Sequence, residues 1–212
     1  MKRIPVLFIL LFLFTDLTVI NGQPGRYNYR KLQPKLGYGI KGGVNIAGQS
    51  SSGKDLGTIV KNIPGINLGG YGNYFFLDYL GVEAELLVSG KGAHWKDFYD
   101  DMKDILTYID VPILVKYQPV EFVNIHAGVV AGLRIKATQK DLETGSKTDI
   151  RDYYNFIDYG LAGGIEANLP NRINLTLRYI YGLSAATTDV KYIAPWKNNV
   201  IQFSAGYRFS GK

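Results

Sequence analysis

The sequence has no cysteine among its 212 residues, and it has only two histidines and two tryptophans. Without cysteine, the chain can form neither a disulfide framework nor a thiolate metal site, and we expect no lipid attachment. Basic residues exceed acidic ones by six. They form no dense basic run, so the composition argues against nucleic-acid binding. No apolar run reaches the ~20 residues that a membrane-spanning helix needs.

The first residues have the pattern of a secretory signal peptide. Lys2 and Arg3 precede an apolar run over 4–14. A positive start, an apolar core of about 7–15 residues and a small residue before the cleavage site are typical of such signals. We therefore predict a signal peptide over 1–22, followed by a basic periplasmic linker over 23–36.

The remainder, 37–212, is predicted to be one all-β domain. Its apolar and polar residues alternate, most clearly in 106–118, as in a strand with one apolar and one polar face. Each alternating segment has about 10–14 residues, whereas soluble strands typically have about 5–6 and a tilted transmembrane strand needs about 9–11. The predicted strands cover 37–48, 65–77, 80–91, 106–118, 122–138, 156–169, 173–184 and 198–209.

Short and long connections alternate between these strands. The short connections are 78–79, 118–121 and 170–172, and the long polar ones are 49–64, 92–105, 139–155 and 185–197. Short periplasmic turns and long extracellular loops are typical of outer-membrane barrels. The sequence therefore predicts an eight-stranded antiparallel up-and-down transmembrane β-barrel. A soluble β-sandwich remains the structural alternative.

The polar faces of the predicted strands indicate what fills the barrel. An eight-stranded barrel is only wide enough for side chains to fill its interior. We therefore predict a buried network of ion pairs and hydrogen bonds rather than an open pore. The predicted lumen residues are Lys41, Glu83, Glu85, Asp110, Lys116, Arg134, Lys136, Glu166, Arg178 and Arg208.

The sequence predicts no catalytic, cofactor or metal site. His126 is expected to point inward as a hydrogen-bonded structural residue, and His94 to be a solvated loop residue. The four aspartates over 97–104 lack the glycine turn and terminal glutamate of an EF-hand loop. The enzyme hypothesis requires His126 or His94 to find an acid or nucleophile across the barrel, and it would be favoured if His126 lay beside Asp110 or a serine.

Three segments carry a resemblance to a known family. They are Gly-Ile-Lys-Gly-Gly-Val-Asn-Ile-Ala at 39–47, Tyr-Ile-Asp-Val-Pro-Ile-Leu-Val-Lys-Tyr at 108–117, and Gly-Tyr-Arg-Phe at 206–209. These segments resemble the PorT-like outer-membrane β-barrel family of Bacteroidota. The resemblance covers about 37–209. It implies a barrel in the outer membrane of a Gram-negative bacterium and no particular reaction, and the family's namesake is linked to protein secretion across that membrane. Ser-Gly-Lys follows the last aromatic, Phe209, which departs from a terminal aromatic residue.

The leading functional hypothesis is a non-enzymatic outer-membrane barrel with a structural, assembly or secretion-associated role in the envelope. Its expected partners are outer-membrane lipid and lipopolysaccharide, the barrel-assembly machinery, and envelope or secretion proteins. The alternatives are an adhesion or small-ligand protein that acts through its long loops, and an envelope lipid-modifying enzyme.

Overall fold

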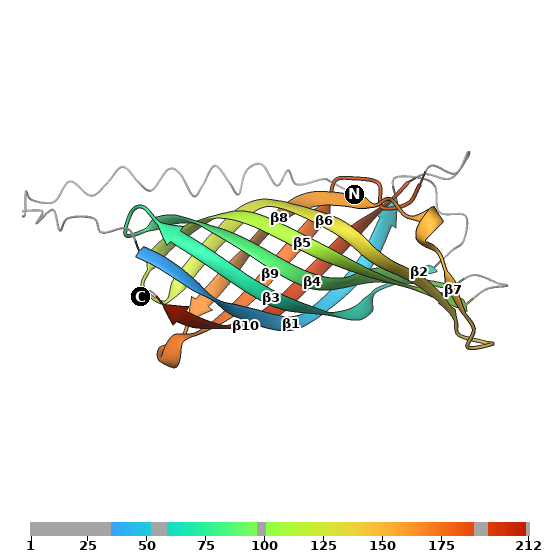
Figure 1. The fold of residues 1–212 in the computed structure, drawn as a ribbon, viewed down its shortest axis with the longest axis horizontal. Coiled ribbons are helices and arrows are strands. Elements are labelled where there is room, and N and C mark those ends of the chain that lie inside the picture. The colour runs from blue at the N-terminus through green and yellow to red at the C-terminus, as the bar shows by residue number, and fades with distance from the viewer. Residues whose placement is uncertain (1–34, 52–58, 97–100, 189–194, 211–212) are drawn as a thin grey trace, which may run out of the picture. The chain divides into compact units, whose positions relative to one another are not determined.

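A computed structural model describes residues 35–51, 59–96, 101–188 and 195–210 (Figure 1). The predicted signal peptide and residues 23–34 of the predicted linker lie outside the described residues. Lys35 and Leu36, predicted to end the linker, already belong to the first strand. Within the part of the chain that is described, no helix is long and apolar enough to cross a membrane.

The described residues form ten strands and two short 3-10 helices. In chain order they are β1 (Lys35–Ser51), β2 (Ile59–Lys61), β3 (Ile63–Phe75), β4 (Leu80–Lys96), β5 (Asp101–Val120), β6 (Val123–Asp141), β7 (Lys147–Asp149), η2 (Arg151–Tyr153), β8 (Ile157–Asn168), η3 (Pro170–Arg172), β9 (Ile173–Gly182) and β10 (Trp196–Ser210). The sequence predicted eight strands. The two additional strands, β2 and β7, have three residues each and lie in segments that were predicted as loops.

The long strands form a closed antiparallel sheet. Pairing runs from β1 through β3, β4, β5, β6, β8, β9 and β10, and β10 pairs with β1 again. Figure 1 shows these strands inclined side by side around a common axis. The short strands extend this sheet at one end, where β2 pairs with β4 and β7 pairs with β6. Closure gives both edges of each long strand a partner, as a strand in lipid requires.

The exterior of the closed sheet is apolar and its interior is polar. Exposed and buried residues alternate strictly along β9. Ile113 and Val115 on β5, Leu161 on β8 and Phe203 on β10 are 44–52% exposed. Their sequence neighbours on the opposite face, such as Lys116, are buried. A soluble sandwich buries its apolar face, so this inverted arrangement argues against that alternative and fits an exterior in contact with lipid.

Aromatic side chains gather where the short connections join the strands. Tyr79 packs edge-on against Tyr117, and Tyr38 lies 6.1 Å from Phe209 between ring centroids. Such rings mark the boundary between hydrocarbon and headgroups in membrane barrels. The exposed aromatic residues at this end are Tyr38, Tyr74, Phe76, Tyr79, Tyr117, Phe122, Tyr207 and Phe209.

The strands β4 and β5 are longer than the sequence pattern predicted. The prediction of a loop over 92–105 is wrong, because β4 continues to Lys96 and β5 begins at Asp101. The paired residues there include His94 opposite Lys103 and Lys96 opposite Asp101. These residues are polar on the exterior face, so the apolar alternation stops although the backbone pairing continues.

A register shift explains why one predicted lumen residue is outside. Thr107 on β5 lies opposite Lys136 on β6, whereas the next residue, Tyr108, lies opposite Arg134. The extra residue, Ile135, forms a bulge, and a bulge reverses the alternation of faces. Lys136 is therefore exposed on the exterior, as Ile135 is, and the prediction that Lys136 points into the lumen is wrong.

Candidate functional site

Six buried charged residues meet inside the barrel and form what we term the first ion cluster. Each side chain is at most 3% exposed. Three are cations and three are anions, so their formal charges balance. Buried charges are tolerated when they are paired in this way. The members are Lys41, Glu83, Glu85, Lys116, Glu166 and Arg178.

Lys41 lies at the centre of the first ion cluster. Its Nζ donates to Glu85 Oε1 at 2.8 Å and to Glu83 Oε1 at 3.3 Å. The same nitrogen lies 3.7 Å from Glu166 Oε2 and 5.0 Å from the centre of the Tyr71 ring. One ammonium therefore holds carboxylates from β4 and β8 together.

The other two cations complete the network. Arg178 binds Glu85 through two parallel hydrogen bonds, from Nη1 to Oε2 at 2.8 Å and from Nη2 to Oε1 at 2.7 Å. Lys116 Nζ donates to Glu83 Oε2 at 2.7 Å and to Glu166 Oε1 at 2.6 Å. The two-point arginine contact fixes orientation as well as charge. The network therefore connects β1, β4, β5, β8 and β9 across the lumen.

His126 belongs to the edge of this network. It is buried, and its Nε2 accepts a hydrogen bond from Arg178 Nε at 3.1 Å. A nitrogen that accepts carries no proton, so the ring is neutral. Asp110 lies opposite Gly132, six residues along β6 from His126. These contacts give His126 a guanidinium neighbour rather than the carboxylate or serine that the enzyme hypothesis needs.

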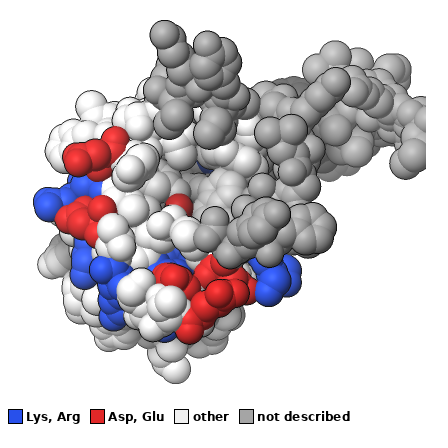
Figure 2. Space-filling view, turned by 90° about the vertical axis from the view of Figure 1, so that its right-hand side faces the viewer, with Lys and Arg blue, Asp and Glu red and all other residues white. Residues whose placement is uncertain are grey.

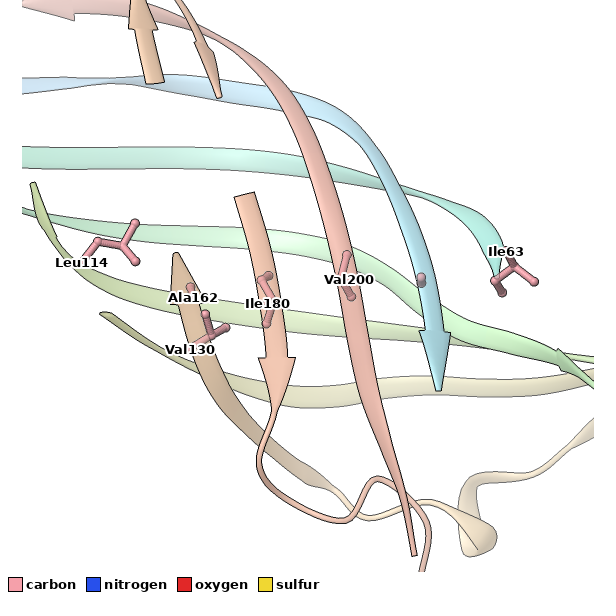
Figure 3. Packing of buried hydrophobic residues seen from close by; sticks show 7 residues of the cluster. Ile63, Leu114, Val130, Ala162, Ile180 and Val200 are labelled. Carbon is pink, nitrogen blue, oxygen red and sulfur yellow. The ribbon is translucent and has the colours of Figure 1, made fainter. Parts of the chain in front are cut away.

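An apolar layer lies next to the first ion cluster. On β5, Leu114 lies between Lys116 and Asp110, and on β8, Ala162 lies between Glu166 and Asp158. These residues are nearly fully buried and point into the lumen (Figure 3). The layer separates two sets of charges along the barrel axis. Its members are Ala47, Ile63, Leu114, Val130, Ala162, Ile180 and Val200.

Beyond the apolar layer, Lys91, Asp110 and Asp158 form a second ion cluster. Lys91 Nζ lies 2.9 Å from Asp110 Oδ1 and 3.2 Å from Asp158 Oδ2. Asp158 also accepts hydrogen bonds from Ser184 Oγ at 2.8 Å and Asn198 Nδ2 at 3.1 Å. The cavity lined by Lys91, Asp158 and Asn198 has a volume of about 10 Å³, which is room for about one water. Side chains therefore fill the lumen at this level.

The remaining predicted lumen residues lie apart from both clusters. Arg134 is buried and donates from Nε to the carbonyl oxygen of Asn155 at 3.2 Å. Arg208 is half-buried near the end of β10. The sequence reasoning omitted Lys91 and Asp158 from the network. Both share a strand face with residues that it assigned inward, so parity along the strand was the signal that could have found them.

A cap of side chains covers the end of the lumen at β7. Tyr154 donates from its hydroxyl to Asp104 Oδ2 at 2.6 Å, and Gln139 Nε2 donates to Asp104 Oδ1 at 3.0 Å. Burial raises the pKa of the Tyr154 phenol, so this hydroxyl keeps its proton and remains a donor. The cap joins the loop after β7 to the barrel wall. Its apolar members are Leu106, Tyr108, Ala137, Ile150, Tyr154 and Ala186.

The second histidine lies on the exterior rather than in a loop. His94, predicted as a loop residue, is on β4, and its Nε2 lies 2.5 Å from Asp101 Oδ1. Lys96 Nζ donates to the other oxygen of Asp101 at 2.6 Å. Asp97 and Asp100 lie outside the described residues. The described residues contain no group of three or more His, Cys, Asp or Glu side chains suited to a metal ion.

The closed sheet and its polar interior agree with a match to a family of known sequences. The model of the outer membrane protein beta-barrel domain matches residues 24–187. The chain belongs to this family. Because it belongs to this outer membrane protein family, the protein is located in the outer membrane of a Gram-negative bacterium. No curated relative matches the sequence.

Solved structures share the fold of this outer membrane protein beta-barrel domain. One of them is Ail, the attachment invasion locus protein of Yersinia pestis, in complex with the heparin analogue sucrose octasulfate. Its sequence is 19% identical to this chain, the TM-score is 0.50, and the match covers 82% of this chain and 99% of Ail. Neisserial surface protein A is 14% identical with a TM-score of 0.52, over 81% of this chain and 97% of that protein. At these identities the likeness shows the fold alone.

Proposed function

We propose that this protein is a non-enzymatic, membrane-spanning barrel with a filled lumen that acts as a structural, assembly or secretion-associated component of the envelope. Its eight long strands β1, β3, β4, β5, β6, β8, β9 and β10 cross the membrane. The observation that carries the proposal is the first ion cluster. The charges of this cluster balance, and its side chains occupy the lumen of the closed sheet. A channel would need water at this place, and a catalyst would need an accessible acid, base or nucleophile there.

The orientation follows from the two ends of the barrel. Connections between β3 and β4, β5 and β6, and β8 and β9 are short and lie at the end with the aromatic residues. The opposite end carries β2, β7 and η2. Short turns face the periplasm in bacterial barrels and the longer segments face outward. We therefore assign the short connections to the periplasm and β2 and β7 to the cell exterior.

The partners follow from this placement. The apolar exterior contacts outer-membrane lipid, and the barrel-assembly machinery inserts the chain. The resemblance of 39–47 and 108–117 to the PorT-like family of Bacteroidota supports a link to envelope or secretion proteins. Such partners would contact the exposed periplasmic turns or the exterior end, because the described side chains of the two ion clusters and the apolar layer fill the lumen between them.

Conductance in a planar bilayer tests the filled lumen. The refolded protein is expected to insert and to give no sustained conductance step. The control is the same protein kept denatured in urea, since it reveals leakage caused by detergent or aggregates. Discrete, reproducible conductance steps from the folded protein alone would contradict the proposal, because ions would then pass the first ion cluster.

One observation favours a second candidate, a surface adhesion or small-ligand protein. Strands β4, β5 and β6 continue beyond the apolar exterior, and β2 and β7 widen them into a five-stranded extension. A rigid extension of this kind can present a binding surface. Shortening the β6–β7 hairpin over 142–146 would abolish adhesion of a non-adherent host strain that expresses the protein, if this candidate holds. Equal adhesion by both forms would refute it.

A further inference from the structure

Cationic side chains form a row across the five-stranded extension. The register places Lys61 opposite His94, His94 opposite Lys103, Lys103 opposite Lys140, and Lys140 opposite Lys147. Residues directly opposite one another in antiparallel strands share a face, with Cβ atoms about 4.5–5.5 Å apart. We call Lys61, Lys103, Lys140 and Lys147 the lysine row, with His94 between its first two members.

The lysine row lies on the exterior face of the barrel. On β5, Lys103 has the same parity as Ile105 and Ile113, which are exposed apolar residues, whereas Asp104 and Leu106 are buried. The row therefore continues the lipid-contacting face rather than the lumen face. In Figure 2, which views the end that carries β2 and β7, basic side chains run along the edge of this face with acidic side chains beside them.

Three nearby aspartates already have partners, and Glu143, in the turn between β6 and β7, is exposed and forms no ion pair among the described residues. Asp101 is bound to His94 and Lys96, and Asp149 is bound to Arg151. Asp141 accepts hydrogen bonds within its own turn from Thr144 and from the backbone N–H of Glu143, and these contacts use both of its oxygens.

No ion pair joins a member of the lysine row to a carboxylate anywhere in the described residues. Like charges directly opposite each other repel. The row thus has cationic charge that the described part of the barrel does not neutralise, and an external anion would relieve the repulsion.

The height of the row matches the headgroups of the outer leaflet. A strand tilted by about 40° advances about 2.5 Å per residue along the membrane normal. From Tyr117, at the aromatic end of β5, Lys103 is about 35 Å away, whereas the apolar band of such barrels is about 25 Å tall. Lys136, opposite Thr107, lies at about the upper edge of that band. Lys103 and Lys140 then lie about 10 Å above it.

We propose that the lysine row is a docking surface for the phosphate groups of the phosphorylated glycolipid in the outer leaflet. The proposal rests on the orientation given under the proposed function. Two features select a lipid over a soluble polyanion: the row faces sideways along the barrel exterior, and its central pair lies about 10 Å above the apolar band, at the level of the headgroups. Basic residues near an anionic membrane surface contribute about 1 kcal/mol each, so several in a row select a headgroup with more than one phosphate.

Native mass spectrometry of the folded protein in a non-ionic detergent tests this proposal. The probe is diphosphoryl lipid A, with dephosphorylated lipid A as the comparison. K103Q/K140Q removes the central opposed pair, and K103R/K140R keeps its charge. R172Q/K197Q removes the same number of charges outside the row. We expect K103Q/K140Q to bind diphosphoryl lipid A about tenfold more weakly or worse, and the other variants to bind like the original.

Each other outcome counts against the lipid assignment. Undiminished binding by K103Q/K140Q, or equal binding of dephosphorylated lipid A, would overturn it. Tighter binding of sucrose octasulfate than of lipid A, lost in the same variant, would assign the row to a soluble sulfated saccharide instead. If K103Q/K140Q does not fold, K140Q/K147Q replaces it.

A gel comparison of boiled and unboiled samples shows whether each variant is folded. The failure of the original protein to form a compact unboiled band would refute the proposed function, whereas a folded barrel without lipid A preference would refute only this inference.

Discussion

Removing one anion from the first ion cluster is expected to destabilise the barrel strongly. Glu85 accepts two hydrogen bonds from Arg178 at 2.7 and 2.8 Å and one from Lys41 at 2.8 Å. Glu85→Gln keeps the volume of the side chain, but three buried cations then face two anions. Breaking a buried pair by removing one partner costs about 3–5 kcal/mol. We therefore expect the free energy of unfolding to fall by about that amount.

A double-mutant cycle separates the pairing of Glu85 with Arg178 from the loss of each residue alone. In E85Q/R178Q the cluster retains Lys41 and Lys116 against Glu83 and Glu166, so its charges balance again. The double variant should therefore lose less stability than the sum of E85Q and R178Q, with a coupling energy of about 2 kcal/mol.

Urea unfolding in lipid vesicles, followed by tryptophan fluorescence, measures these changes. The two tryptophans, Trp95 and Trp196, pack edge to face with ring centroids 4.4 Å apart, so their emission should report unfolding. Asp149→Asn, which breaks an exposed pair with Arg151, is the control and should leave the transition unchanged. A loss below about 1 kcal/mol for E85Q, or strict additivity in the cycle, would refute the reasoning.

Three further predictions concern the exterior, the cap and pH. Leu161→Arg places a charge on the apolar exterior near the middle of β8 and should cost about 2–4 kcal/mol in vesicle unfolding. An equal transition for Leu161→Arg and for Thr148→Arg, at an exposed residue of β7, would contradict a lipid-facing belt. Tyr154→Phe removes the hydroxyl that binds Asp104 and should speed hydrogen exchange of amides 150–155 while β8 exchange stays slow; unchanged exchange would show that this bond does not hold the cap. The pKa of Asp149 is lowered below its usual 3.8, chiefly by the backbone N–H of Arg151. The contribution of Asp149 to order at β7 is therefore complete above about pH 4 and is lost as pH falls through the lower pKa of the folded state. Limited proteolysis should cut near β7 faster at low pH, and a pH-independent rate would argue against this role.

The alternation of residues along single strands could be read from the sequence, since it depends only on strand parity. Tyr108 to Tyr117 illustrates this, because its apolar members such as Ile113 are exposed and Lys116 is buried. The extension of β4 and β5 to Lys96 and Asp101 could not be read in this way. Outside the apolar band the exterior face is polar, so the hydrophobic pattern vanishes while the hydrogen-bonded ladder continues.

The partners inside the lumen depend on register, which the sequence pattern leaves open. Lys91 and Asp158 are separated by 67 residues, and only the stagger of β4 against β8 brings them to one level. The bulge at Ile135 adds one residue and reverses the faces above it, which is why Lys136 could not be placed from alternation. The polar faces could thus be predicted, whereas their ion pairs required the closed sheet.

Heat-modifiable gel mobility tests the central claim, a closed barrel embedded in the outer membrane, most directly. The protein without residues 1–22 is refolded in detergent and run with and without boiling, beside its far-ultraviolet circular dichroism. The account predicts a compact, faster band in the unboiled sample and a β-sheet spectrum that depends on detergent or lipid. A protein that stays soluble without detergent and migrates identically in both lanes would contradict it.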